Sequence, residues 1–397
     1  MSARAARPSG PLRHLTTDLD ELRRKDRLRL RPPALDREHR AGRLLLCSND
    51  YLGYQSRDLL RPYAERAARG TPVGSGASRL VSGEHPAHAA LEHALAAWLE
   101  TEHCLVFTSG YAANVGAIAA LASEGDLVVS DELNHASIVD GCRLSRATVV
   151  VTPHVALDAV GRALAESMGR RRWVITESYF SMDGDSPDLP ALRRACDEFD
   201  AALIVDEAHA LGVFGPAGRG RMAEAGVSAD VTVGTLGKAL GAQGAFVAGS
   251  AALCHWLWNR ARSFGFSTGI SPLLCAIATC AVELARHDDA GRVRLFDVSA
   301  ALRDGLAARG LAPMSAAGPI LPIILGTEAL ALTWSQHLAN LGVDVQPIRP
   351  PTVPAGTSRL RVTASAALSS EDVDMALNAF ARVRRELPAD SGGTTDG

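Results

Sequence analysis

The stretch Ala202-Leu203-Ile204-Val205-Asp206-Glu207-Ala208-His209 places four apolar residues directly before a carboxylate, with a histidine three residues further on. A short apolar run of this kind predicts a strand that is buried on both faces of a parallel sheet. Ligands of open α/β sheets bind beyond the carboxyl ends of the strands. Asp206 and His209 are therefore expected at a ligand-binding edge.

Six further short apolar runs surround this one, at residues 105–108, 127–130, 148–152, 173–177, 231–234 and 245–249. Helix-period segments lie between several of them, at residues 88–100, 112–121, 157–168 and 189–199. Strands that alternate with helices predict an α/β fold with a mainly parallel seven-stranded sheet covered on both faces.

The pattern changes after residue 285. Strand candidates at residues 320–325, 343–348 and 360–364 accompany helix candidates at 328–341 and 370–386, which predicts a smaller α+β domain with an antiparallel sheet. Residues 17–31 are read as a charged helix or arm that ends at Pro32-Pro33. The predicted organisation is an N-terminal arm over 1–47, a large domain over 48–285, a small domain over 286–387 and a disordered tail over 388–397.

Composition excludes several function classes. The 397 residues carry 41 Lys and Arg against 44 Asp and Glu, so nucleic acid or an anionic membrane is not the expected partner. The seven cysteines form no C-x-x-C pair, which argues against a disulfide framework or a zinc site and favours a reducing compartment. No signal peptide is recognised, and the longest apolar-looking stretch, residues 271–285, is too short to span a bilayer. A cytoplasmic location is expected.

Motifs of other enzyme classes fail on inspection. The segment 74–79 begins like a dinucleotide-binding fingerprint, but Arg79 stands at the third glycine position. Gly237-Lys238 is followed by Ala239 where a P-loop needs Ser or Thr. The three histidines at 85, 88 and 93 are interpreted as a helix start rather than as a metal site, so no metal is expected.

Four segments remain at or just beyond predicted strand ends: 109–111, 131–135, 206–209 and 235–238. Lys238 lies among small residues after an apolar strand, where an amine of lowered pKa can act as a nucleophile. The alternative interpretation of Lys238 is an ordinary lysine at the start of a helix that points to water. A buried Asp206 needs a cationic partner, and a pyridinium nitrogen is one. A lysine together with such an acid indicates a site for pyridoxal 5'-phosphate (PLP).

Six segments in order along the chain resemble the α-oxoamine synthases, PLP enzymes of the aspartate-aminotransferase-like fold (PLP fold type I). The resemblance covers about residues 45–365 and is carried by 48–53, 74–79, 131–137, 181–185, 205–209 and 234–238. The segment 349–357 is most similar to the biotin-pathway branch of that family.

The resemblance implies a role for each matching residue. Lys238 would hold the cofactor and later move the α-proton of the amino acid, Asp206 would pair with the pyridine nitrogen, and His209 would bind the phenolic oxygen of the ring. His135 would stack on the ring; the alternative is a core histidine bonded to backbone. The remaining matches to the cofactor are Gly110, Tyr111, Ser181, Thr235 and Thr268, and those to the substrate are Arg29, Asn49, Thr352 and Arg361. Arg29 is one of five arginines that compete for its position.

The implied reaction is a decarboxylative condensation of L-alanine with a pimeloyl thioester, on coenzyme A or acyl carrier protein, to give 8-amino-7-oxononanoate, CO2 and a free thiol. The resemblance also implies a homodimer with a shared active site. Sister activities stay open: glycine C-acetyltransferase, 5-aminolevulinate synthase and serine palmitoyltransferase. So do, more distantly, an aminotransferase or aldolase of the same fold and a non-catalytic partner subunit.

Overall fold

The computed structural model describes residues 10–30, 42–167 and 169–388. Apart from Pro388, the tail predicted to be disordered lies outside these residues. The chain divides into two compact units. The large unit comprises Asn49–Val298 and Ser365–Ala367, and the small unit comprises the described parts of Met1–Ser48, Ser299–Ala364 and Leu368–Gly397. The domain limits proposed from the sequence, at residues 47 and 285, remain predictions.

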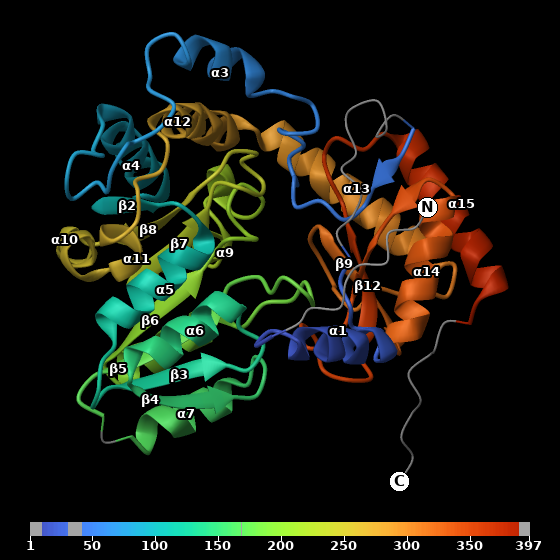
Figure 1. The fold of residues 1–397 in the computed structure, drawn as a ribbon, viewed down its shortest axis with the longest axis horizontal. Helices are drawn as coiled ribbons and strands as arrows, with labels where there is room; N and C mark the ends of the chain where they lie inside the picture. The colour runs from blue at the N-terminus through green and yellow to red at the C-terminus, as the bar shows by residue number, and fades with distance from the viewer. Residues whose placement is uncertain (1–9, 31–41, 168, 389–397) are drawn as a thin grey trace. The chain divides into compact units, whose positions relative to one another are not determined.

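A seven-stranded sheet forms the centre of the large unit, in the order β2-β8-β7-β6-β5-β3-β4 (Figure 1). The strands are β2 (His103–Phe107), β3 (Leu127–Asp131), β4 (Thr148–Thr152), β5 (Arg172–Glu177), β6 (Ala201–Asp206), β7 (Val231–Thr235) and β8 (Ala245–Gly249). All neighbours are parallel except β8, which pairs antiparallel with β2 and β7. The predicted mainly parallel sheet is confirmed.

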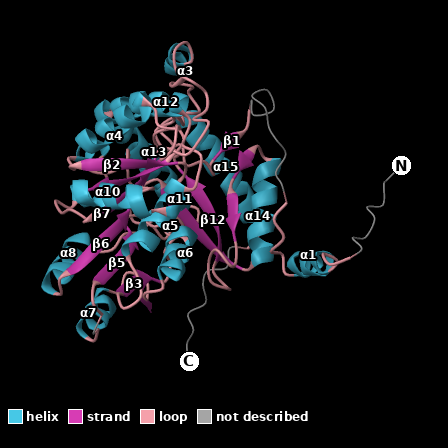
Figure 2. Ribbon diagram, turned by 60° about the vertical axis from the view of Figure 1, so that its left-hand side comes forward, coloured by secondary structure: helices cyan, strands magenta, loops and turns pink. Residues whose placement is uncertain are grey.

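Helices cover both faces of this sheet (Figure 2). One core joins the sheet to α5, α6, α10 and α11, and the other joins it to α7 and α8. The helices of the large unit are α3 (Arg61–Ala67), α4 (Pro86–Leu99), α5 (Gly110–Leu121), α6 (Ala136–Ser145), α7 (Leu157–Ala165), α8 (Leu189–Glu198), α9 (Arg221–Glu224), α10 (Ala251–Arg260), α11 (Arg262–Gly265), α12 (Pro272–His287) and the first half of α13 (Asp289–Ala307), with a 3-10 turn at Pro216–Gly218.

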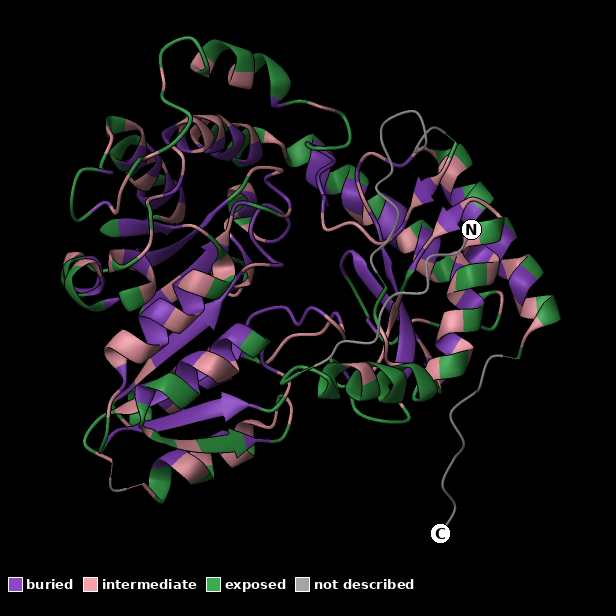
Figure 3. Ribbon diagram, viewed as in Figure 1, coloured by how far each residue is buried: buried purple, intermediate pink, exposed green. Residues whose placement is uncertain are grey.

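Burial along the strands follows from this layering (Figure 3). The inner strand β3 is buried at every position, whereas the edge strand β4 exposes three of its five residues. A strand covered on both faces needs an unbroken apolar run, which is why these strands were recognisable in the sequence.

The small unit contains a three-stranded antiparallel sheet in the order β11-β12-β9. Its other elements are the second half of α13, the helices α1, α14 and α15, and the two-residue strands β1 and β10, which pair in parallel. The bounds are α1 (His14–Arg24), β1 (Leu44–Leu45), β9 (Ile320–Gly326), α14 (Glu328–Asn340), β10 (Val343–Asp344), β11 (Gln346–Ile348), β12 (Ser358–Thr363) and α15 (Ser370–Glu386).

Two predicted elements of the small unit need correction. The single strand expected over residues 343–348 is two strands, because Val345 separates a parallel pairing with β1 from an antiparallel pairing with β12. The helix expected over residues 17–31 is α1, and it ends at Arg24. The chain folds back there, where the amides of Arg27 and Leu28 both donate to the carbonyl of Leu22.

Candidate active site

The carboxyl ends of β7, β6, β5 and β3 lie side by side, since these strands are consecutive neighbours in the sheet. Asp206 at the end of β6 is directly opposite Glu177 at the end of β5 in the register. Thr235 ends β7 and Asp131 ends β3. The sheet therefore collects the predicted strand-end residues along one edge of the large unit.

Asp206 is buried, with 7% of its surface exposed, and is held by neutral donors. Asn114 of α5 donates from Nδ2 to Oδ2 of Asp206 at 2.7 Å, and the amide of Ala208 donates to Oδ1 at 2.8 Å. The Oδ1 atom of Asn114 is buried without a hydrogen-bond partner in the described structure. A buried carboxylate oriented in this way is suited to hold a positive charge, because burial without one is costly.

Glu177 is an acid that the sequence did not single out. Its Oε1 accepts the amide of His135 at 2.7 Å, and the amide of Ser181 also donates to its carboxylate. Burial raises the pKa of Glu177 to about 8, and the negative charge of Asp206 adds to this, while Lys238 acts in the opposite direction. Glu177 thus connects two predicted cofactor contacts, His135 and Ser181, through their backbones.

His135 caps the N-terminus of α6 and reaches solvent at this edge. Its Nδ1 accepts the amide of Ser137 at 3.2 Å and lies 2.7 Å from the Ser137 hydroxyl. The protein packed around the imidazole lowers its pKa; the charge of Asp206 opposes this shift and that of Lys238 reinforces it. A neutral, outward-facing ring is suited to stack on a flat ligand.

His209 is buried and oriented by Tyr51, whose hydroxyl lies 2.7 Å from His209 Nδ1. The same hydroxyl lies 3.3 Å from Oδ1 of Asn49, a predicted substrate residue. Asn49 and His209 therefore belong to one group of side chains around Tyr51. A contact from His209 to a cofactor would use Nε2.

Lys238 follows β7 in a tight turn and is half-buried. The amide of Gly241 donates to the Lys238 carbonyl at 2.9 Å, and Gly241 has a φ of +63° and lies against Tyr54. The chain contains only two lysines, and the other, Lys25, is paired with Glu21 on the exposed surface of α1. Lys238 is thus the single lysine of the large unit.

The first turn of α5 provides the predicted phosphate site. Ser109 caps the helix, and its hydroxyl accepts the amide of Ala112 at 3.2 Å. A Cβ atom built on Gly110 would meet nothing within 4 Å, so open space lies over this backbone. The hydroxyl of the exposed Tyr111 donates to Oδ2 of Asp140. Thr235, another predicted cofactor contact, ends β7. Its hydroxyl donates to the Gly244 carbonyl at 3.1 Å.

Thr268 lies in the loop after α11 and lines a small cavity together with Phe107 and Thr108 at the carboxyl end of β2. The next residue, Gly269, packs against Arg79 and Ser75, so this loop is joined to the segment 74–79. Phe266 in the same loop is 81% exposed.

The remaining predicted substrate residues lie in the small unit. Arg29 donates from Nη2 to the Thr352 hydroxyl at 2.9 Å, and both line a cavity of about 250 Å³ together with Arg27 and Arg349. Burial, with the positive charge of Arg29, lowers the pKa of Arg349. Arg27 is paired with Glu328 at 2.9 Å. Arg361 is buried within β12.

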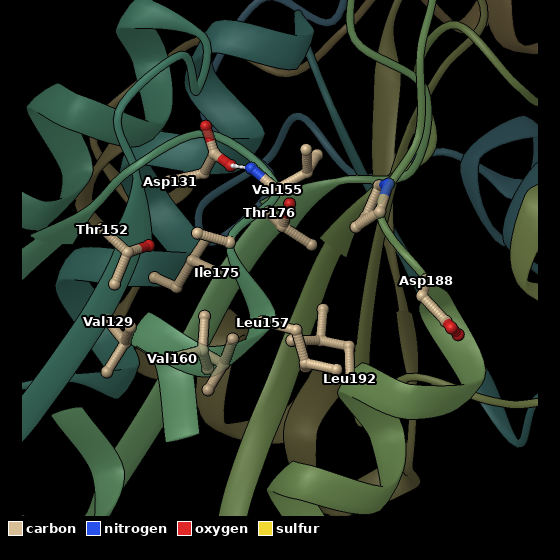
Figure 4. A pocket seen from close by; sticks show the side chains of 13 residues that line it. Val129, Asp131, Thr152, Val155, Leu157, Val160, Ile175, Thr176, Asp188 and Leu192 are labelled. Atoms are coloured by element: carbon tan, nitrogen blue, oxygen red, sulfur yellow. Dashed lines mark hydrogen bonds between the residues drawn. The ribbon is translucent and has the colours of Figure 1, made fainter. Parts of the chain in front are cut away.

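Neither Arg27 nor Arg349 was assigned a role from the sequence: Arg27 is one of several similar arginines in the N-terminal arm, and Arg349 lies near the other end of the chain. Another cavity lies in the large unit, between α7, α8 and the sheet (Figure 4). It is mostly apolar and measures only about 30 Å³. It has room for about one water molecule, so it is not a substrate site. No described helix is long and apolar enough to cross a membrane.

Comparison with known proteins identifies the class. The family model of aminotransferase class I and II matches residues 42–380. The chain belongs to this family and, within it, to the α-oxoamine synthases.

The relatives with similar sequences and structures include 8-amino-7-oxononanoate synthases and serine palmitoyltransferases. The chain is 49% identical over 345 residues to an 8-amino-7-oxononanoate synthase of Anaeromyxobacter dehalogenans, covering 86% of this chain and 87% of that one. A solved serine palmitoyltransferase of Sphingomonas wittichii matches with a TM-score of 0.84 at 32% identity, covering 87% and 88%. A serine palmitoyltransferase variant from S. paucimobilis with a bound PLP–myriocin aldimine matches with a TM-score of 0.87 at 27% identity, covering 94% and 98%.

Proposed function

We propose that this protein is an acyltransferase that uses PLP to condense L-alanine with a pimeloyl thioester, releasing CO2, a free thiol and 8-amino-7-oxononanoate for biotin synthesis. The observation that carries the proposal is the strand-end edge with Lys238, Asp206, His135 and His209, in a chain 49% identical to an 8-amino-7-oxononanoate synthase.

The residues at this edge fit PLP. The buried Asp206 carboxylate matches a pyridinium, and the open backbone at Gly110 lies at a capped helix N-terminus, which favours a phosphate. Bound PLP supplies a carbonyl that an amine can attack and a ring that accepts electrons from a bond broken at the amino-acid α-carbon.

The chain's own groups would then divide the work. Lys238 would supply the amine that holds the cofactor, and its Nζ would take the α-proton of the amino acid. Asp206 would keep a proton at the ring nitrogen, and His209 would donate to the phenolic oxygen. His135 would stack on the ring. Ser181 and Thr235 add hydroxyl groups, with Thr235 first giving up its bond to Gly244.

The arginine cluster of the small unit is proposed to receive the far carboxylate of the acyl chain. The cavity brings together three guanidinium groups and Thr352, whereas the carboxylate of Glu328 pairs with only one of them, Arg27. A guanidinium–carboxylate pair gives both charge and direction. Arg361 is proposed to receive the carboxylate of the amino acid and Asn49 to line the substrate site.

The test is thiol release from acyl-coenzyme A with different amino acids. L-Alanine with pimeloyl-CoA is expected to release thiol at least tenfold faster than glycine or L-serine with the same thioester. A preference for glycine with acetyl- or succinyl-CoA, or for L-serine with palmitoyl-CoA, would assign a sister activity instead.

A matched pair of thioesters tests the arginine cluster. Heptanoyl-CoA has a methyl group where pimeloyl-CoA has its terminal carboxylate. Arg349→Gln is therefore expected to raise KM roughly tenfold or more for pimeloyl-CoA and to leave KM for heptanoyl-CoA unchanged. Arg382→Gln, which removes an exposed arginine on α15, is the control. An equal effect of Arg349→Gln on both thioesters would contradict this role.

Two copies of the chain are further proposed to share the site, with Thr268 of each copy reaching the partner's phosphate, and acyl carrier protein is proposed as an alternative thioester carrier. Phe266, two residues before Thr268, is a large apolar side chain that is exposed in the single chain. This exposure supports the proposal that a second copy covers the loop. A cytoplasmic location is also proposed.

A further inference from the structure

His154 lies between β4 and α7 and contacts two acids, one at the end of β3 and one in the loop between β5 and α8. Its Nδ1 lies 2.9 Å from Oδ1 of Asp131, and its Nε2 lies 2.9 Å from Oδ2 of Asp185. The edge of its ring packs on Phe180, with centroids 4.5 Å apart and planes at 88°. Only 18% of the side chain is exposed. His154 was not singled out in the sequence.

This geometry defines the charge of the ring. An ionised carboxylate can only accept hydrogen bonds, so two carboxylates at the two ring nitrogens require both nitrogens to carry protons. The charged groups that face His154 are Asp131, Asp185 and Glu132, whose Oε1 accepts the His154 amide at 2.9 Å. Burial alone would lower the pKa, but the bonds to Asp131 and Asp185 outweigh it and raise the pKa of His154 to about 10.

Each acid is part of a segment that leads to a proposed cofactor contact. Asp131 accepts the amides of Leu133 and Val155 at 2.8 Å, the second of which Figure 4 shows, and so fixes the start of the segment that ends at His135. Asp185 closes the turn that contains Ser181: its carbonyl accepts the Phe180 amide at 2.9 Å.

We propose that His154 is a positioning residue, a link between two carboxylates that ties the turn carrying Ser181 to the segment carrying His135. Glu177 connects the same two segments from the buried side, through the amides of His135 and Ser181. His154 makes the connection at their outer ends. Without the outer link, the two contacts to the cofactor are held from the buried side by Glu177, and their spacing is less restricted. The inference rests on the proposed function, because that function assigns His135 and Ser181 to PLP.

The test is a double-mutant cycle on PLP binding by the cofactor-free protein, measured by fluorescence titration. His154→Gln and Asp185→Asn are each expected to raise the dissociation constant about tenfold. The double variant is expected to have a PLP dissociation constant no higher than that of the single variant that binds PLP less tightly, because both changes break the same link. His287→Gln, which removes an exposed histidine–glutamate contact on α12, is the matched control and should bind like the wild type.

A second readout is pH. A histidine of raised pKa contributes while it is charged, and its contribution is lost as pH rises through about 10. The ratio of the His154→Gln and wild-type dissociation constants should therefore be constant from pH 7 to 9 and approach one above pH 10.

Outcomes against the proposal are clear. Unchanged binding by His154→Gln, or losses that add fully in the double variant, would overturn it. If His154→Gln does not fold, as circular dichroism would show, Asp185→Asn and the control decide alone: a tenfold loss supports the link, and unchanged binding overturns it. Failure of the wild type to bind PLP would refute the proposed function instead.

Discussion

At the scale of single residues, two acids end neighbouring strands and face each other across the register. Asp206 is kept in place by Asn114 and the Ala208 amide, whereas Glu177 accepts backbone amides from the next segments. Burial disfavours the ionised form of Glu177, and the negative charge of Asp206 adds to this, so the pKa of Glu177 is raised. The sequence indicated Asp206 because it ends a buried apolar run and a histidine lies three residues further on. Glu177 also ends a predicted strand, but no histidine follows it, and its partners are main-chain amides that the sequence does not reveal.

Glu177→Gln tests this arrangement in the cofactor-free protein. A carboxyl group whose pKa rises from 4.5 to about 8 on folding contributes stability below pH 4.5, and that contribution is lost as pH rises through 8. Glutamine cannot ionise. The free energy of unfolding of the variant relative to wild type should therefore increase by about 2–4 kcal/mol between pH 4.5 and 8.5. Urea denaturation at the two pH values measures it, and a difference independent of pH would contradict the raised pKa.

At the scale of elements, a contact between two loops explains why residue 269 is a glycine. A Cβ atom on Gly269 would lie 2.9 Å from Arg79 Cγ and 3.2 Å from Ser75 Oγ. The Gly269 amide donates to the Ala77 carbonyl at 2.9 Å. Arg79 itself cannot retreat easily, since it is buried and bonds Glu84 and Glu92. The segment 74–79 is thus a packing partner of the 266–269 loop.

Gly269→Ala is expected to destabilise the protein by roughly 1–3 kcal/mol, because the added methyl group overpacks this contact. Gly161→Ala in the middle of α7 is the control. A Cβ atom there meets nothing within 4 Å, so it should stabilise by roughly 0.5–1 kcal/mol. Thermal unfolding of both variants measures the difference. Equal melting temperatures of the two variants would show that the Gly269 contact can accommodate a methyl group, which would contradict this prediction.

Elements differ in how far the sequence could predict them. The seven strands of the large sheet were found to within one or two residues because both faces are covered and each strand is an unbroken apolar run. The run over 343–348 looked like one strand, and only its two partners, β1 and β12, divide it. The strand β1 lies about 300 residues before β10, and a pairing at that separation leaves no local signal in the sequence.

At the scale of the whole molecule, the predicted site residues fall into two sets. Those proposed to hold PLP belong to the large unit, and Arg29, Thr352 and Arg361 belong to the small unit. The strand ends could be predicted because parallel strands share one edge. The Arg27, Arg29 and Arg349 cluster could not, because its members come from both ends of the chain. His154 escaped notice because its meaning depends on two acids brought to it by the fold.

The composition of the molecule allows a direct test of the central claim, that Lys238 holds PLP. In the Lys25→Arg variant, Lys238 is the only lysine. Borohydride reduction of this variant after incubation with PLP, followed by peptide mass spectrometry, should place the reduced cofactor on Lys238 in most molecules. A variant that remains unlabelled there while wild type is labelled at Lys25, or labelling confined to the N-terminal amine, would contradict the account.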